Sequence, residues 1–257
     1  MLTALTRKVS PGLASCQLEY LKREPIDVAR AAAQHSNYEA ALERLGARVV
    51  SLSTEPDLPD CVFVEDPALV LGEIAIITRM GAESRRSESE SLAAALAGFR
   101  PLARMREPAT LEGGDVVLMG KTLYVGLSRR TNAAGAKQLV AIVEPYGYRV
   151  VPVQVTGCLH LKSACCAVSD DSVLANRALF DSSVFSGRMI DVPAEEPGAA
   201  DVLRIGNTLL IPESFPRTAR LLEHSGFQVE SLDVSELQKA EAGVTCMSLV
   251  FDDVGRA

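Results

Sequence analysis

The sequence contains 257 residues, of which 47% are hydrophobic and 23% are charged, and its net charge is −7. This composition is typical of a soluble globular protein and excludes a fibrous repeat or a disordered chain. The negative charge makes nucleic acid and anionic membrane surfaces unfavourable partners, so we expect neither.

The N-terminal residues, MLTALTRKVSPGL, lack the continuous apolar stretch of a secretory signal. No segment approaches the roughly 18 apolar residues of a membrane span, so we expect a cytoplasmic protein. Six cysteines are too few for a disulfide scaffold and are expected to be reduced thiols. No cysteine pair has CxxC spacing and the chain has three histidines, so a structural metal site has little support.

Four segments along the chain have the pattern of a strand, a tight turn and a second strand. Apolar runs rich in β-branched residues flank each turn, as is typical of β-hairpins. The segments are 64–79, 112–127, 160–175 and 201–212, with turns at Gly72-Glu73, Gly120-Lys121, Asp170-Asp171 and Gly206-Asn207. A fifth hairpin is expected between TCMSLVF near the C-terminus and LTALTR at the N-terminus, and this pairing would close a ring.

Segments with helical periodicity lie between the hairpins. Residues 26–45 carry apolar side chains at three- and four-residue spacing, and residues 132–146 and 216–225 have the same pattern. Each of these segments leads into another apolar strand, namely RVVSLS, RVVPVQV or QVESLDV.

The repeated unit is therefore strand, strand, helix, strand. It predicts an α/β fold in which similar blades surround an axis, and periodicity alone leaves an ordinary α/β sheet as the alternative. No linker or change in composition divides the chain, so residues 1–257 are expected to form a single domain. In a ring, the inner strand ends of different repeats converge, so residues distant in sequence can share one pocket.

The expected strand ends carry polar residues where a structural strand would prefer apolar ones. These are Asp60, Glu65, Asp66, Glu112, Asp115, His160, Thr245, Cys246 and Ser248. A thiol, an imidazole and several carboxylates suit nucleophilic attack on a cationic carbon, because the carboxylates bind a guanidinium and the imidazole transfers protons. Taken singly, each has a simpler explanation: a buried thiol, a structural histidine, a turn or a solvated acid.

Six motifs occur in one order along the chain: FVEDP at 63–67, MGAESRR at 80–86, LEGGD at 111–115, SRRTN at 128–132, LHLKS at 159–163 and GVTCMS at 243–248. In sequence and spacing they resemble the dimethylarginine dimethylaminohydrolase family, in its bacterial form. The resemblance implies the pentein fold, a five-bladed pseudo-symmetric α/β propeller of ββαβ units, in agreement with the repeat.

The resemblance also implies roles for single residues. Cys246 is expected to be the nucleophile and His160 the acid and base, while Asp66 and Glu112 bind the guanidinium. Glu65 and Phe63 are expected to line the same pocket, and Arg85 and Arg130 to bind the substrate α-carboxylate. Asp60 and the backbone of Leu13 are expected to contact the α-amino group. Asp115 and Ser248 are expected to support the site.

Two positions depart from the family pattern. Ala240 stands in the pocket where a bulkier branched residue is expected, which predicts a wider mouth. Cys16 follows Gly12 in a loop where a mobile lid is expected, and we interpret it as a surface thiol.

The reaction implied is hydrolysis of Nω-methylated L-arginine to L-citrulline and dimethylamine or methylamine, through a covalent thiouronium on the cysteine. It needs no cofactor, and the resemblance favours a homodimer. Two alternatives remain: arginine deiminase or another guanidine hydrolase, and a non-catalytic binding protein with the pentein fold. The chain has no room for the added helical region of arginine deiminases.

Overall fold

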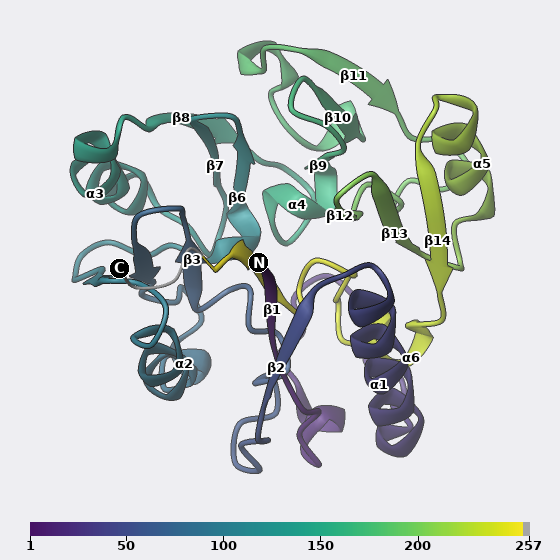
Figure 1. Ribbon diagram of the computed structural model, residues 1–257, viewed down its shortest axis with the longest axis horizontal. Helices are drawn as coiled ribbons and strands as arrows, with labels where there is room; N and C mark the ends of the chain where they lie inside the picture. The colour runs from purple at the N-terminus through teal and green to yellow at the C-terminus, as the bar shows by residue number, and fades with distance from the viewer. Residues whose placement is uncertain (254–257) are drawn as a thin grey trace.

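The computed structural model describes residues 1–253, and within them five three-stranded sheets surround a common axis (Figure 1). In every sheet the first two strands are antiparallel and the third strand runs parallel to the middle one. The five-bladed α/β propeller predicted from the repeat is therefore confirmed.

The blades follow one another along the chain, and one of them joins the two chain ends. The first consists of β15 (Leu249–Asp252), β1 (Leu2–Arg7) and β2 (Arg48–Leu52), and the second of β3 (Ala68–Val70), β4 (Ala75–Ile77) and β5 (Leu102–Arg104). The third consists of β6 (Val116–Met119), β7 (Thr122–Leu127) and β8 (Arg149–Gln154). The fourth consists of β9 (Cys165–Ala167), β10 (Ser172–Ala175) and β11 (Arg188–Asp191), and the fifth of β12 (Leu203–Ile205), β13 (Thr208–Pro212) and β14 (Gln228–Leu232).

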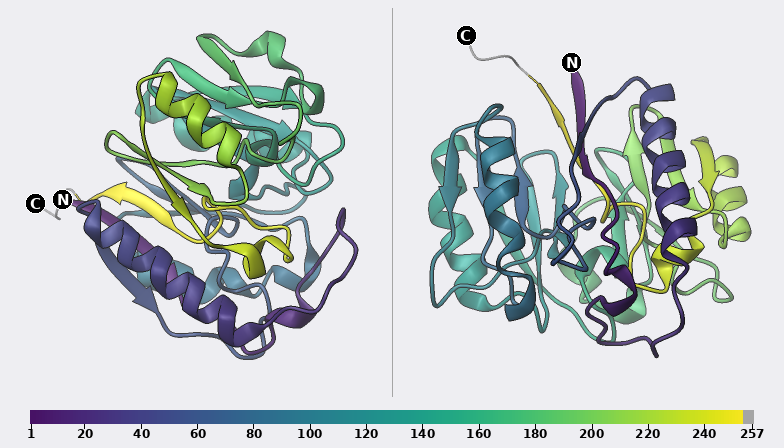
Figure 2. Two further views of the ribbon diagram at one scale, coloured as in Figure 1. Left: turned by 90° about the vertical axis from the view of Figure 1, so that its right-hand side faces the viewer. Right: turned by 90° about the horizontal axis from the view of Figure 1, so that it is seen from below.

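The longer helices lie on the outside of the ring (Figures 1 and 2). They are α1 (Val28–Arg44), α2 (Glu88–Leu96), α3 (Ala133–Val143) and α5 (Pro216–His224), while α4 (Leu161–Ala164) and α6 (Ser235–Gln238) are single turns. Asp27 and Asn132 begin α1 and α3 as N-caps, because their side chains accept hydrogen bonds from the first helical turn. Apolar residues of α1, such as Tyr38 and Leu42, face the core.

The hairpin turns lie where the sequence predicts them. Gly120 and Gly206 both have positive φ, at 57° and 58°, which a tight two-residue turn requires and glycine adopts without strain. Two predictions were wrong in detail. Residues 161–164 form α4 instead of the start of a strand, and the C-terminal strand begins only at Leu249, so the residues around Cys246 form a loop.

The repeat is less regular than the ββαβ unit implies. The second blade contains α2 and β5, which sequence periodicity did not reveal. Between the second and third strands of the fourth blade, residues 176–187, all of them described, contain two 3₁₀ segments in place of an α-helix. These segments are η5 (Arg177–Leu179) and η6 (Ser182–Val184).

The strand at the N-terminus closes the ring. It pairs with β15 on one side and β2 on the other, in the register Leu2 to Asp252 and Thr3 to Arg48. Figure 2 shows β1 and β15 leaving the ring side by side at one end of the molecule. Among residues 1–253, none of the helices combines the length and the apolar character required to cross a membrane.

Candidate active site

Each blade is entered by a short segment that carries a polar residue toward the centre of the ring. Asp66 precedes β3, Asp115 precedes β6, His160 precedes α4 and β9, Asp201 precedes β12, and Cys246 precedes β15. Four of these five residues are less than 9% exposed, and Cys246 is partly exposed. The pseudo-symmetry of the ring thus brings together residues that are far apart in the chain. The most distant two, Asp66 and Cys246, are 180 positions apart.

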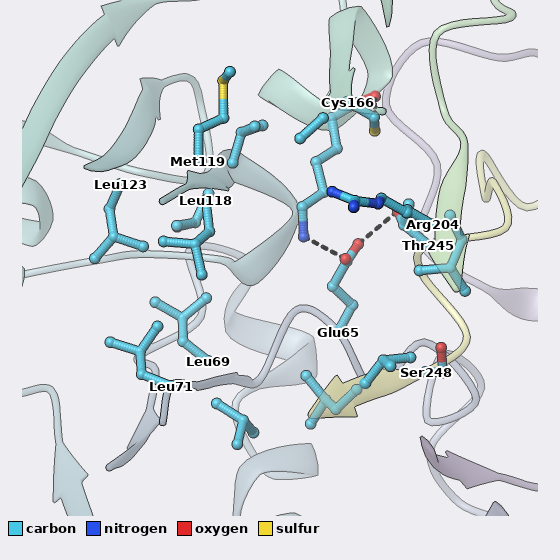
Figure 3. Close-up of a pocket in the computed structure, with 18 of the residues that line it drawn as sticks. Glu65, Leu69, Leu71, Leu118, Met119, Leu123, Cys166, Arg204, Thr245 and Ser248 are labelled. Carbon is cyan, nitrogen blue, oxygen red and sulfur yellow. Dashed lines mark hydrogen bonds and ion pairs between the residues drawn. The ribbon is translucent and has the colours of Figure 1, made fainter. Parts of the chain in front are cut away.

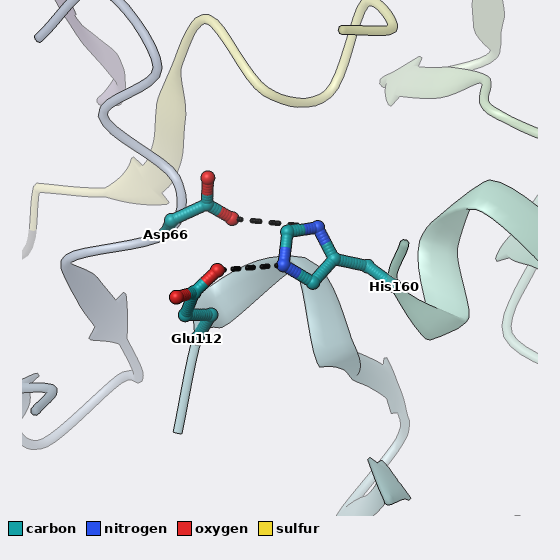
Figure 4. Close-up of side chains that lie close together, drawn as sticks. All are labelled: Asp66, Glu112 and His160. Carbon is teal, nitrogen blue, oxygen red and sulfur yellow. Dashed lines mark hydrogen bonds and ion pairs between the residues drawn. The ribbon is translucent and has the colours of Figure 1, made fainter. Parts of the chain in front are cut away.

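His160 lies between two carboxylates (Figure 4). Its Nε2 is 2.8 Å from Glu112 Oε2, and its Nδ1 is 3.8 Å from Asp66 Oδ1. Burial opposes the charged imidazolium, but the charge of Asp66 and the hydrogen bond with Glu112 outweigh burial and raise the pKa of His160 to about 9. His160 therefore carries a proton at neutral pH.

The pKa of Glu112 is shifted in the opposite direction, downward. Burial alone would raise its pKa, but the hydrogen bond and charge of His160, together with Arg85 and Arg130, hold the pKa of Glu112 well below its usual range. The side chain is fully buried and stays ionised. The pair is thus an imidazolium hydrogen-bonded to a carboxylate.

The two glycines of the LEGGD motif permit this close approach. A Cβ on Gly113 would lie 2.0 Å from the backbone oxygen of Glu65, and a Cβ on Gly114 would lie 2.6 Å from His160 Nδ1. Glycine is needed at both positions because no larger residue leaves room. Asp115 follows, and its carboxylate accepts the Leu161 N–H at 2.9 Å, which fixes the backbone next to His160.

Cys246 lies in the loop before β15. Its Sγ accepts a hydrogen bond from the Gly243 N–H at 3.3 Å. Burial raises the pKa of the thiol well above its ordinary value, and the charges of Asp201, Glu65 and Asp66 raise it further. The thiol is therefore neutral at pH 7 in the free protein.

Cys246 and His160 line one cavity of about 270 Å³. Tyr20 and Leu21 from the N-terminal loop and Asp201 also line it. The nucleophile and the acid that the sequence predicted therefore face a common space.

The two carboxylates predicted to bind a guanidinium both bind an arginine of this chain. Arg85 Nη1 lies 2.7 Å from Asp66 Oδ2, and Arg130 Nη1 lies 3.2 Å from Glu112 Oε2. Arg85 also forms a bidentate ion pair with Glu88, which the sequence did not single out. The role of Arg85 and Arg130 in α-carboxylate binding stays a prediction.

Asp66, Glu112 and His160 offer oxygen and nitrogen atoms that all lie within 4.8 Å of one another, a spacing that could hold a metal ion. However, the carboxylates already pair with Arg85 and Arg130, so a metal ion would have to displace both arginines and the proton of His160. The donor set therefore suits an organic cation better than a metal ion.

The other predicted residues occupy varied positions. Asp60 accepts the Gln17 N–H at 3.1 Å, Glu65 forms an ion pair with Lys162, and Ser248 hydrogen-bonds Tyr38 at 2.6 Å. Leu13, Phe63 and Ala240 belong to one buried hydrophobic cluster. Their contacts with substrate stay predictions. The interpretation of Cys16 as a surface thiol was wrong, because its side chain is fully buried in that cluster.

A second cavity, of about 370 Å³, follows the inner strands of the blades (Figure 3). Leu69, Leu71 and Leu123 line one side of it and Arg204 another. Ser248 lines this second cavity, whereas Glu65 and Lys162 line both cavities.

Three side chains of the site escaped the sequence analysis. Asp201 occupies the position before β12 that Asp115 has before β6, and the shared Asp-Val pair of DVLRIG and DVVLMG was the available signal. Glu88 and Glu241 have no such signal. Glu88 pairs with Arg85 in a segment without a clear helical pattern, and the partners of Glu241, residues 19–21, lie at least 220 positions away in the sequence.

Comparison with known proteins identifies relatives across the chain. The family model described as "N,N dimethylarginine dimethylhydrolase, eukaryotic" matches residues 15–180. A protein of Streptomyces coelicolor named N(G),N(G)-dimethylarginine dimethylaminohydrolase is 43% identical over 247 residues, which cover 96% of this chain and 95% of that protein. A protein of the same name from Pseudomonas aeruginosa is 37% identical over 228 residues, 88% of this chain and 90% of that protein.

Solved structures give the same result. This chain is similar to the Pseudomonas aeruginosa enzyme, solved as a cysteine-to-serine variant with citrulline, with a TM-score of 0.93 and 34% identity over 98% of this chain and all of that one. A histidine-to-glycine variant of dimethylarginine dimethylaminohydrolase, solved as an adduct with S-methyl-L-thiocitrulline, matches equally well. The N-terminal domain of the cyanobacterial arginine dihydrolase ArgZ shares the fold, with a TM-score of 0.85 at 18% identity.

Proposed function

Because this chain belongs to the dimethylarginine dimethylaminohydrolase family, whose members hydrolyse a guanidinium C–N bond, we propose that it converts Nω-methylated L-arginine to L-citrulline and dimethylamine or methylamine. One observation carries the proposal. Asp66 and Glu112, beside the protonated His160, each already bind a guanidinium group, that of Arg85 or Arg130.

Substrate binding is the first step. The guanidinium of the methylated arginine replaces those of Arg85 and Arg130 on Asp66 and Glu112, and the two arginines then bind the α-carboxylate. Asp60 and the backbone oxygen of Leu13 bind the α-amino group. One substrate guanidinium, placed between the two carboxylates, thus takes the place of two arginine side chains.

The bound cation then ionises the nucleophile. Burial, together with the charges of Asp201, Glu65 and Asp66, keeps the Cys246 thiol neutral, so a guanidinium that offsets this negative charge lowers the thiol pKa, and the thiol releases its proton to water. The thiolate attacks Cζ, and the imidazolium of His160 gives its proton to the departing amine. A covalent S-alkylthiouronium on Cys246 results.

Hydrolysis completes the cycle. The neutral imidazole of His160 accepts a proton from water, and the hydroxide attacks Cζ of the thiouronium. The C–S bond breaks, the thiolate leaves, and citrulline is released. Glu112 holds the imidazole in place in both steps through its 2.8 Å contact with Nε2.

A citrulline assay tests this function. Asymmetric dimethylarginine, monomethylarginine, arginine and agmatine are offered separately, and we expect turnover of the two methylated substrates. Cys246→Ser should abolish turnover while methylarginine binding, measured by calorimetry, survives. A fully active Cys246→Ser variant would refute the assignment.

The same assay distinguishes the proposed activity from that of an arginine deiminase. An arginine deiminase of Listeria monocytogenes is 34% identical over 110 residues, 38% of this chain and 27% of that protein. Preferential turnover of unmethylated arginine would therefore favour that reaction. The homodimeric state and cytoplasmic location stay predictions, and light scattering of the purified protein tests the first.

A further inference from the structure

Asp201 lies next to the nucleophile, and in the reaction described above it contacts neither the substrate nor the transferred proton. It is 8% exposed and lines the same cavity as Cys246. Its Oδ1 accepts the backbone N–H of Thr245 at 3.0 Å, and its Oδ2 lies 2.9 Å from the Thr245 hydroxyl. Two contacts therefore hold the residue directly before Cys246.

Asp201 also packs against Gly243. A Cβ on Gly243 would lie 2.1 Å from Asp201 Cγ, so the two residues are as close as a glycine permits. The N–H of Gly243 is the group that donates to Cys246 Sγ. Asp201 thus contacts both residues, Gly243 and Thr245, that determine where the sulfur lies.

Hydrogen counting shows that this network contains an additional proton. The Thr245 hydroxyl lies 2.9 Å from Asp201 Oδ2 and also 2.9 Å from Glu65 Oε2. A hydroxyl donates one hydrogen, so two ionised carboxylates would leave one of these oxygen pairs without a hydrogen between them. One proton on either carboxyl group satisfies both contacts.

The acidities of the two groups agree with this count. Burial raises the pKa of Glu65 to about 7 against the opposing charge of Lys162, and burial likewise raises the pKa of Asp201. At neutral pH the two acids can therefore hold one proton between them.

We propose that Asp201 is a positioning residue for Cys246: it holds the 243–246 turn and, through Thr245 and Glu65, sets the negative charge that faces the thiol. The inference rests on the proposed function, because it requires Cys246 to be the nucleophile. The charged groups around the thiol are Asp201, Glu65, Asp66, Glu241, His160 and Lys162.

The first test removes the charge and keeps the shape. In Asp201→Asn an amide oxygen still accepts the Thr245 N–H. At the alkaline pH where the thiol ionises, both acids of the wild type have lost their shared proton, so the variant carries one negative charge less beside the thiol. We expect the pH midpoint for alkylation of Cys246 by iodoacetamide to fall by about one unit, as is typical for loss of one nearby like charge. The alkylation is followed by mass spectrometry on the peptide that contains Cys246, because the chain has six cysteines.

Asp191→Asn is the matched control. The Asp191 side chain is 61% exposed and pairs with Arg177 on the surface. This variant removes the same charge far from the site and should leave the midpoint unchanged. An unchanged midpoint in Asp201→Asn as well would overturn the proposal.

The second test concerns position and does not require Asp201→Asn to fold. Thr245→Val removes the hydroxyl that joins Asp201 to Glu65, whereas Thr245→Ser keeps it. We expect kcat of Thr245→Val to fall at least about tenfold with a much smaller change in KM, and Thr245→Ser to retain most of the turnover. Equal turnover in the two variants would contradict the inference.

A failure of the inference about Asp201 can be distinguished from a failure of the proposed function. Alkylation uses no substrate, so its midpoint can shift even if the wild-type protein does not form citrulline. A protein that forms citrulline but shows neither the shifted midpoint nor the Thr245 difference would leave the function standing and remove the role of Asp201.

Discussion

His160 links the chemistry of the site to the stability of the fold. Its pKa of about 9 in the folded protein exceeds the ordinary value of 6.5. A raised pKa means that protonation favours the folded state, so this stabilisation is complete below about pH 6.5 and disappears as the pH rises through about 9. The pair with Glu112 behaves oppositely at low pH, because the depressed pKa of Glu112 gives stability that is lost on acidification.

We therefore predict that the free energy of unfolding falls between pH 6.5 and pH 10 by about 3 kcal/mol through His160, since one pKa unit is worth about 1.4 kcal/mol. In His160→Asn the amide can still hydrogen-bond Glu112 but does not titrate, so this contribution to the pH dependence should vanish. Urea unfolding of both proteins at the two pH values measures the difference.

His35→Asn is a suitable control. His35 is also buried, but burial lowers its pKa, so it is neutral throughout this pH range. Its replacement should leave the pH dependence as in the wild type. If His160→Asn also kept the wild-type dependence, the imidazolium assignment would be wrong.

Among the elements, the N-terminal loop is held beside the cavity in part by the side chain of Glu241. The carboxylate of Glu241 accepts backbone N–H groups from Glu19, Tyr20 and Leu21, and the last two residues line the cavity beside Cys246. Glu241 itself has a φ of 61°, a conformation that is uncommon for a residue with a side chain. Its backbone is thus held in place where its carboxylate can bind the loop.

We predict that Glu241→Ala loosens this loop. Three amides lose their acceptor, so their hydrogen exchange should speed up at least about tenfold, which corresponds to about 1.4 kcal/mol of local stability. KM for methylarginine should rise because the loop covers the cavity less often. Hydrogen exchange followed by mass spectrometry on the peptide that contains residues 19–21 measures the first effect.

Glu223→Ala, on the exposed side of α5, removes an acid without a contact to the loop and should change neither quantity. Unaltered exchange of residues 19–21 in Glu241→Ala would show that other contacts, such as Arg130 to Glu19, suffice to hold the loop.

The elements that could be predicted from the sequence are those specified by residues close together in the chain. A turn pair such as Gly120-Lys121 and an amphipathic helix such as α1 are specified by neighbouring residues, so both were predictable. The helix α2 was not, because Ser87 provides no side-chain cap and the segment ESESLAAAL has a weak apolar face. Site roles came from the family motifs, whereas the contact of Glu241 with Leu21 joins residues 220 positions apart, which no local pattern connects.

At the scale of the whole molecule, the site exists only if the ring is closed. Its residues enter from five blades, and one of these blades is completed by β1, whose last five residues are buried between β15 and β2. The residues predicted to act in catalysis lie far from β1 in sequence. Loss of β1 should therefore damage the site without removing any of its side chains.

We predict that deletion of residues 1–7 abolishes both the cooperative thermal transition and citrulline formation. The matched control keeps β1 but moves the chain ends: Asp253 is joined to Met1 through a short glycine linker, and the chain begins at Asn207. The Met1 amino group already lies 3.1 Å from the Asp253 carbonyl oxygen, and Gly206 lies in an open turn with no atom within 4 Å of a Cβ built there. This permuted chain should fold and remain active, because it preserves every strand pair of the ring. If the deleted chain were active instead, the remaining four blades would suffice to place Cys246 beside His160, and closure by β1 would serve only stability.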